Sequence, residues 1–162
     1  MRIAVFPGSF DPFTTGHLEL AGRASALFDR VYAAVLVNPD KKSAFSLEER
    51  LGMIQSALRA AALSNVEAAA FSGLTVEFAR SVGAGWLIRG LRGPSDLEYE
   101  MRLEAANRRL HPGLQTVYLA SAAEQAFISS SAVREIASFG GDLDGLVPDA
   151  IKNMIAERLI KR

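Results

Sequence analysis

Polar and positively charged side chains gather in five short segments, each of which follows an apolar stretch of the chain. The first segment runs from Pro7 to His17, where a Gly-Ser turn precedes the pair Gly16-His17. The other segments are 38–42, 72–75, 89–92 and 127–134, and they carry lysines, arginines and hydroxyl groups. Cations and the free N–H groups of helix N-termini bind phosphate. If the segments meet, they could bind a polyphosphate.

Each of these residues also has a purely structural interpretation. His17 could face solvent in the first turn of a helix, but the positive end of a helix disfavours a protonated imidazole, so we favour a ligand beside it. Lys41-Lys42 could be a solvated loop. Arg89 ends an apolar strand, where an unpaired charge is rare, which favours a functional role; an ion pair with a helix acid is its structural alternative. Ser129 is expected to cap a helix whether or not it also binds phosphate.

Several other chemistries lack the residues that they need. No G-x-G-x-x-G follows the first apolar stretch and no Gly-Lys pair occurs, which excludes the dinucleotide fingerprint and the P-loop. No G-x-S-x-G is present for a serine hydrolase. The chain has no cysteine, and its two histidines stand 94 positions apart. We therefore expect no metal site made by the protein.

Hydrophobic patterning indicates which elements hold these segments. Apolar stretches predict strands over 3–6, 31–37, 66–71, 86–88 and 116–119, and amphipathic segments between them predict helices. Ser46-x-x-Glu49 and Ser95-x-x-Glu98 read as capping boxes that open two of the helices. A further helix is expected from near Ser131 to Gly140, and a last one after Pro148.

Alternating strands and helices predict a parallel sheet between helical layers. The expected fold is α/β: a single Rossmann-like domain over residues 1–162, with a doubly wound sheet of five parallel strands and helices on both faces. The loops that follow parallel strands collect at one edge of the sheet, and ligands bind in that crevice.

Composition narrows the choice of partners. The chain has 162 residues, of which 49% are hydrophobic, and its 18 Lys and Arg balance its 18 Asp and Glu. A neutral chain does not predict the broad basic face of a nucleic-acid binder. No apolar run approaches the ~20 residues needed to span a bilayer, so no membrane partner is expected. The absence of cysteine fits a cytoplasmic protein.

Three motifs carry a resemblance to a known family. Pro7-Gly8-Ser9-Phe10-Asp11-Pro12-Phe13-Thr14-Thr15-Gly16-His17 and Ile128-Ser129-Ser130-Ser131-x-Val133-Arg134 resemble the two signatures of the T/H-x-G-H nucleotidyltransferases. The stretch from Arg89-Gly90-Leu91-Arg92 through Asp96, Glu98, Tyr99 and Glu100 to Asn107-Arg108 is similar to that of the bacterial phosphopantetheine adenylyltransferases. Asn38-Pro39-x-Lys41-Lys42 and Phe45–Arg50 agree with that family.

The resemblance implies a reaction and its partners. The adenylyl group of ATP would pass to 4′-phosphopantetheine, giving dephospho-CoA and pyrophosphate, the penultimate step of coenzyme A biosynthesis. Transfer would be in line, without a covalent enzyme intermediate, and Mg²⁺ would accompany ATP. The family also implies a homohexamer and inhibition by CoA.

The resemblance also assigns site residues. His17 and Lys41 would be catalytic. The ATP-binding residues would be Ser9, Phe10, His17, Gly90, Leu91, Arg92, Glu100, Gln125, Ala126, Phe127, Ile128, Ser129, Ser130 and Ser131. Phosphopantetheine would be held by Ser9, Lys41, Thr75, Arg89, Leu74 and Asn107. The family usually has an aromatic residue and then a serine where this chain has Gln125-Ala126, so the side-chain contacts of these two residues are open.

Three alternatives compete with this interpretation. Another transferase of the superfamily could adenylate nicotinamide mononucleotide or activate a polyol phosphate, although the Arg89–Glu100 motif argues against it. A fragment like a class I synthetase is disfavoured because 162 residues leave no room for tRNA binding. A nucleotide-binding sensor without turnover is a third possibility, against which the presence of both His17 and Lys41 counts.

Overall fold

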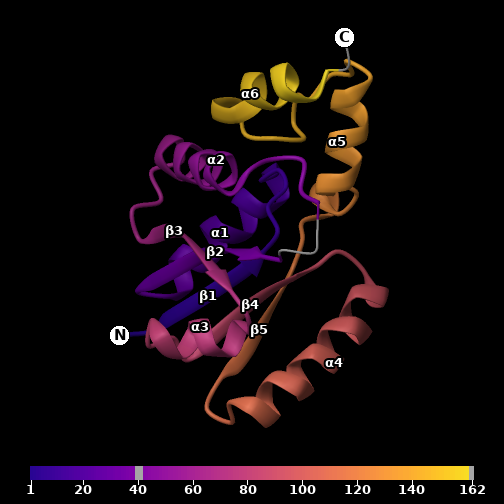
Figure 1. The fold of residues 1–162 in the computed structure, drawn as a ribbon. Coiled ribbons are helices and arrows are strands. Elements are labelled where there is room, and N and C mark those ends of the chain that lie inside the picture. Colours follow the sequence, from indigo (N-terminus) through magenta and orange to yellow (C-terminus); the bar gives the residue numbers. More distant parts are fainter. Residues whose placement is uncertain (39–41, 161–162) are drawn as a thin grey trace.

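Five strands alternate with helices in the computed structural model, which describes residues 1–38 and 42–160 (Figure 1). The strands are β1 (Ile3–Gly8), β2 (Arg30–Val37), β3 (Val66–Ser72), β4 (Trp86–Leu91) and β5 (Gln115–Ala120). The helices are α1 (Thr15–Leu27), α2 (Leu47–Ala60), α3 (Thr75–Ser81), α4 (Pro94–Leu110), α5 (Ser130–Ser138) and α6 (Asp149–Leu159), with a short 3₁₀ turn η1 (Ala123–Gln125). All five predicted strands are confirmed, and each is longer than predicted by one to three residues.

The two central strands of the sheet, β1 and β4, diverge along their length. The described strands are all parallel, in the order β3-β2-β1-β4-β5. β1 pairs with β2 from Ile3 to Gly8, but with β4 only at Ala4 and Val5. Beyond Val5 the two central strands separate towards their carboxyl ends. This is the switch point of a doubly wound sheet, where ligands bind, and it confirms the predicted fold class.

Alternate side chains of the strands pack against two different helical layers. On one face Ala4 and Phe6 join a core with α1 and α2, and α5 and α6 extend that layer (Figure 1). On the other face Val5 and Leu87 pack with α3, and α4 lies along β4. The two-residue period of a strand divides the apolar side chains between the layers. No helix within residues 1–38 and 42–160 is long and apolar enough to cross a membrane.

Helix starts follow the sequence signals at α2 and α5 but not at α4. Ser46 and Glu49 form the predicted capping box, and Ser129 caps α5. The predicted capping box of Ser95 and Glu98 is wrong. α4 begins two residues earlier than that capping box predicts, at Pro94 with Gly93 as its N-cap, because proline in the first turn is preorganised for a helix. Ser95 is thus inside the helix, and Glu98 pairs instead with Arg102 one turn later.

Candidate active site

The separating ends of β1 and β4 open into a cavity of about 650 Å³. Its wall is built by the loop after β1, the end of β4, the start of α4, the turn before α5 and the first residues of α5. His17, Arg92 and Ser129–Ser131 all line it, although they are up to 114 positions apart in the chain. Residues of four of the five expected segments therefore meet at one edge of the sheet, whereas residues 39–41 of the second segment lie outside the described residues.

Most of the predicted site residues line this cavity. They are Ser9, Phe10, His17, Thr75, Arg89, Gly90, Arg92, Glu100, Gln125, Ile128, Ser129, Ser130 and Ser131. Asn107 lines a smaller adjoining cavity of about 90 Å³, which shares Thr75, Arg89 and Glu100 with the first. Leu74, Leu91, Ala126 and Phe127 are not among the residues that line either cavity, and Leu74 and Phe127 are exposed. Lys41 lies outside the described residues.

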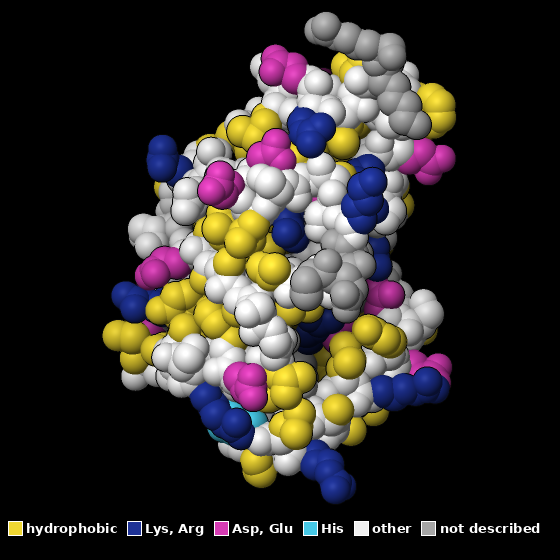
Figure 2. Space-filling model, in the orientation of Figure 1, with side chains coloured by type: hydrophobic (Ala, Val, Ile, Leu, Met, Phe, Trp, Pro, Cys, Tyr) yellow, Lys and Arg dark blue, Asp and Glu magenta, His cyan; other side chains and the backbone are white. Residues whose placement is uncertain are grey.

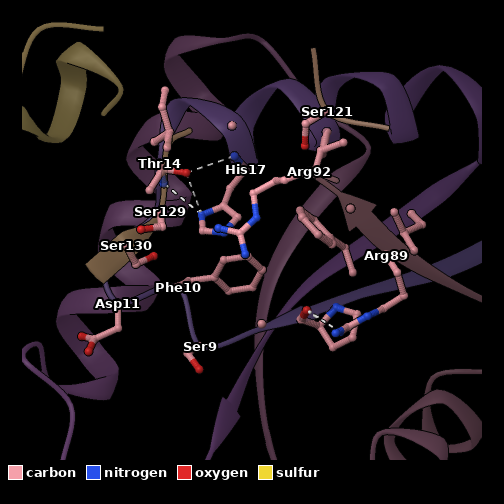
Figure 3. Close-up of a pocket in the computed structure, with 18 of the residues that line it drawn as sticks. Ser9, Phe10, Asp11, Thr14, His17, Arg89, Arg92, Ser121, Ser129 and Ser130 are labelled. Atoms are coloured by element: carbon pink, nitrogen blue, oxygen red, sulfur yellow. Dashed lines mark hydrogen bonds between the residues drawn. The ribbon is translucent and has the colours of Figure 1, made fainter. Parts of the chain in front are cut away.

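Thr14 fixes the tautomer of His17. The backbone N–H of Thr14 donates to His17 Nδ1 at 3.0 Å, and the N–H of His17 donates to Thr14 Oγ1 at 3.2 Å. Because Nδ1 accepts a hydrogen bond, the neutral ring carries its proton on Nε2. Figure 3 shows the imidazole held against Thr14 on one side, with the Arg92 guanidinium reaching towards it. Nε2–H is left to donate into the cavity.

His17 is held in its neutral form. Desolvation by burial, and then the positive charge of Arg92, lower the pKa of His17 to about 4. Near neutral pH the ring therefore acts as a hydrogen-bond donor and carries no charge. Its orientation is fixed by aromatic packing, because the ring centroid of Phe10 lies 5.0 Å away at an interplanar angle of 87° and that of Phe13 lies 5.5 Å away.

The loop after β1 needs glycine at position 8. A Cβ on Gly8 would lie 2.9 Å from the ring of Phe10, so any larger residue would displace that ring. Phe10 in turn contacts Phe6 and His17. The Gly-Ser turn of the first signature therefore supports the aromatic packing around His17 directly.

Arg89 and Glu100 form a bidentate ion pair inside the cavity. Arg89 Nε and Nη2 each donate to a Glu100 oxygen at 2.6 Å, and the Glu100 side chain is buried. The structural alternative left open for Arg89 by the sequence, an ion pair with a helix acid, is therefore present. Arg89 also lines both cavities, so the pair presents an oriented guanidinium to any ligand there.

The start of α5 offers hydroxyl and N–H groups beside His17. Ser129 Oγ accepts from the N–H of Ala132 at 3.1 Å, and Ser130 Oγ donates to the carbonyl of Pro12 at 2.8 Å. The first N–H groups of an α-helix have no partner within the helix and attract anions. Across the cavity, the backbone N–H and Nε of Arg92 both donate to Asp96 Oδ2, at 2.9 and 3.3 Å.

Two buried groups, Asp11 and Thr14, shape the site although the sequence motifs assign them no role. Asp11 accepts from the N–H of Phe45 at 2.9 Å and from that of Ala44 at 3.0 Å, and Arg134 lies 3.7 Å from it. Thr14 orients His17. The spacing Thr-x-x-His at the start of a helix could have predicted the contact of Thr14 with His17. The partners of Asp11 are 33 or more positions away in the chain, so no local pattern could have predicted its contacts.

Gln125 occupies the position where this chain departs from the family pattern. Gln125 lines the cavity, and a Cβ added to Gly16 would lie 4.0 Å from the Cβ of Gln125. Its Oε1 is buried with no hydrogen-bond partner among the described residues, as is Oε2 of Glu19. The side chain thus packs over the start of α1, next to His17.

Several known proteins resemble this chain in sequence. Residues 5–136 match the family model described as cytidylyltransferase-like. A phosphopantetheine adenylyltransferase of Heliobacterium modesticaldum is 46% identical over 98% of this chain and 93% of its own length. The proteins of the same name from Carboxydothermus hydrogenoformans and Clostridium tetani are 47% and 44% identical, over 99% and 98% of this chain and 98% of their own lengths.

Solved structures share the fold at low identity. A bifunctional NMN adenylyltransferase/ADP ribose pyrophosphatase of Francisella tularensis superposes with a TM-score of 0.74 at 18% identity. The match covers 96% of this chain and 49% of that one, so the chain spans about half the length of the bifunctional protein. A putative nicotinate-nucleotide adenylyltransferase of Vibrio parahaemolyticus superposes with a TM-score of 0.67, also at 18% identity, over 96% of this chain and 99% of its own. These matches establish the architecture alone.

Proposed function

The chain belongs to the cytidylyltransferase-like family and, within it, to the phosphopantetheine adenylyltransferases, and we propose that the cavity between β1 and β4 performs this reaction. The chain is thus a nucleotidyltransferase of coenzyme A biosynthesis, which transfers the adenylyl group of ATP to 4′-phosphopantetheine. One observation carries the assignment of the cavity. A neutral histidine donor, two arginines and a helix N-terminus converge on a single space at the switch point.

The reaction needs alignment more than proton transfer. An oxygen of the phosphopantetheine phosphate attacks the α-phosphorus of ATP, a new P–O bond forms, and the bond to the β-phosphate oxygen breaks. The products are dephospho-CoA and pyrophosphate. A phosphate monoester is already largely anionic at neutral pH, so the nucleophile needs no general base. Such transfers depend on positioning and on neutralising charge around phosphorus.

His17 is placed to act on the reacting phosphate. Its Nε2–H would donate to an oxygen of the α-phosphate as negative charge grows there in the transition state. Arg92, Ser129 and the N–H groups at the start of α5 would take the β- and γ-phosphates. These assignments rest on the positions of the groups around one cavity.

The other substrate would occupy the side towards α4. Arg89, oriented by Glu100, would bind the phosphate of phosphopantetheine together with Ser9, Thr75 and Lys41. Asn107 in the adjoining cavity would line the pantetheine arm, together with Leu74, which directly precedes Thr75 in the chain.

Lys41→Ala is expected to lower turnover and weaken phosphopantetheine binding. Initial rates measured over both substrates test this, and unchanged kinetics would remove Lys41 from the mechanism.

Mg²⁺ would enter as part of the substrate MgATP. The two buried carboxylates that line the cavity are already engaged by donors of the chain, Asp11 by two N–H groups and Glu100 by Arg89. A site built from these carboxylates therefore does not fit the ion. Phosphate oxygens and water are its usual ligands in such reactions.

The direct test is to mix ATP, Mg²⁺ and 4′-phosphopantetheine and look for dephospho-CoA, with ATP formation from dephospho-CoA and pyrophosphate as the reverse assay. A panel with nicotinamide mononucleotide and a polyol phosphate, followed by pyrophosphate release, separates this activity from the related transferases. ATP binding with no turnover on any of these acceptors would favour the sensor alternative.

The family resemblance supports further proposals about the whole protein. We propose that residues 1–162 form a single domain, that the protein is cytoplasmic and inhibited by CoA, and that it is a homohexamer. Among the described residues α4 buries only Glu100, and Leu97, Tyr99, Met101, Leu103 and Leu110 of this helix are exposed. Figure 2 shows hydrophobic side chains among charged ones in the region of α4. Sedimentation velocity tests the assembly, and a monomer would refute it.

A further inference from the structure

Arg50, at the start of α2, is a buried cation behind the wall of the cavity. Its relative exposure is 5%. Nη1 donates to the carbonyl of Ser9 at 3.0 Å, and Nε donates to the carbonyl of Ser46 at 3.4 Å. Over residues 1–38 and 42–160 no carboxylate lies within ion-pair distance of its guanidinium. The charge is therefore held by two neutral carbonyl groups.

The nearby acid, Asp11, forms no ion pair with Arg50 among the described residues. The two carboxylate oxygens of Asp11 accept hydrogen bonds from the N–H groups of Ala44 and Phe45. Arg134 lies 3.7 Å from the same carboxylate. Asp11 thus pairs with Arg134, whereas Arg50 has no ion-pair partner in the part of the chain that the structure describes. Burying a charge without an ion-pair partner is costly, and an anion bound nearby would offset part of that cost.

The contact with Ser9 shows where that anion would bind. Ser9 lines the cavity, and Figure 3 places it on the same rim as Phe10 and Asp11. A carbonyl oxygen that faced the cavity would repel phosphate. Arg50 instead holds the Ser9 carbonyl towards itself, away from the ligand, and places a cation directly behind it.

We propose that Arg50 is a positioning residue for the phosphate groups of the substrates. It orients the Ser9 peptide, and its positive charge raises the affinity of the cavity for anions. Arg50 is not one of the residues that line the cavity, so it acts through Ser9 and through its field and does not touch the substrate. The proposal rests on the proposed function, since it assumes that the ligand carries phosphate.

Binding of ATP and of adenosine to the purified full chain separates charge from shape. Arg50→Gln keeps a hydrogen-bond donor and removes the charge, and we expect ATP affinity measured by calorimetry to fall by about tenfold while adenosine affinity stays within about twofold. Arg50→Lys keeps the charge and should restore ATP affinity to within about threefold of the wild type. Arg59→Gln, an exposed arginine in the last turn of the same helix, is the matched control and should change neither affinity.

The measured affinities show whether Arg50 acts on phosphate binding or only supports the fold of the loop. Equal losses for ATP and adenosine would mean that Arg50 supports only the fold of the loop, and unchanged ATP affinity in a folded Arg50→Gln would also overturn the proposal. If Arg50→Gln does not fold, Arg50→Lys decides alone, because a tenfold loss of ATP affinity with the charge retained contradicts the role of the field. Failure of the wild type to form dephospho-CoA would refute the proposed function, yet the ATP and adenosine comparison would still test Arg50.

Discussion

The neutral state of His17 follows from its surroundings. Burial and the charge of Arg92 both oppose protonation, and the N–H of Thr14 occupies the nitrogen that could otherwise accept a proton. A neutral donor avoids a second positive charge beside Arg92 in the free protein. It can still stabilise an oxyanion through Nε2–H, as donors aimed at developing charge do.

Removing the imidazole should therefore lower the rate and leave the fold intact. His17→Ala is expected to reduce kcat by about 10²–10³, the usual effect of deleting one donor to a transition-state oxyanion. Initial rates with saturating ATP and phosphopantetheine measure this, and circular dichroism checks the fold. A variant within threefold of the wild type would exclude His17 from the transition state.

The lowered pKa of His17 also makes stability depend on pH. The unfolded chain takes up a proton near pH 6.5 and the folded chain only near pH 4, so unfolding binds protons between these values. The stabilisation is complete above pH 6.5 and is lost as pH falls towards 4, by up to roughly 3 kcal/mol. Urea unfolding of the wild type and of His17→Asn measures the difference. Parallel pH profiles for the two proteins would contradict the burial of the neutral ring.

At the scale of elements, the N-termini of three helices determine where the site groups lie. Thr14 caps α1 beside His17, Ser46 caps α2 behind Ser9, and Ser129 caps α5 beside the expected phosphates. Each cap fixes the direction in which a loop enters its helix. The loop before α2 is further fastened to the first signature by the bonds of Asp11 to Ala44 and Phe45.

The capping box of α2 gives a prediction at this scale. Ser46→Ala removes the acceptor for the N–H of Glu49, which lies 3.1 Å from Ser46 Oγ, and should lower the free energy of unfolding by about 1 kcal/mol. Ser56→Ala in the middle of α2 is the control, and it should be neutral or slightly stabilising because alanine favours a helix interior. Chemical denaturation measures the free energy of unfolding of both variants. Equal changes in that free energy would show that the cap does not contribute to stability.

At the scale of the molecule, the approach of α1 to the end of β4 defines the cavity. A Cβ on Gly90 would lie 2.4 Å from Leu20 Cδ1, so any larger residue at position 90 would displace the Leu20 side chain. Leu20 is buried against the core and also lines the cavity. The separation of β1 from β4 on one side and this close contact on the other together leave space for a ligand at the switch point.

Gly90→Ala should therefore push Leu20 into the cavity. We expect a loss of about 1–3 kcal/mol of stability, as for other overpacked cores, together with weaker ATP binding. Gly22→Ala, where a Cβ on α1 would meet nothing within 4 Å, should instead stabilise by up to about 1 kcal/mol. Thermal unfolding and calorimetric titration with ATP test both variants. Normal ATP binding by Gly90→Ala would show that Leu20 can be accommodated elsewhere.

The sequence by itself determined the features that depend on local order. Strand and helix periodicity, the caps at Ser46 and Ser129 and the two signature motifs are set by neighbours within a few positions, so the fold class and most lining residues could be predicted. The start of α4 was misplaced because Pro94 and Ser95 both signal a helix start, and the position of Pro94 decided it.

Only the tertiary structure decided how distant groups pair. The bond from Arg50 to Ser9, the pairing of Arg89 with Glu100 and the lowered pKa of His17 arise where segments 11 to 75 positions apart pack together. Burial and the electric field at a side chain depend on everything packed around it, and no local pattern in the chain records that. The types of residue in the site could thus be predicted from the sequence. The distances between them and the charge state of His17 are determined only by the folded structure.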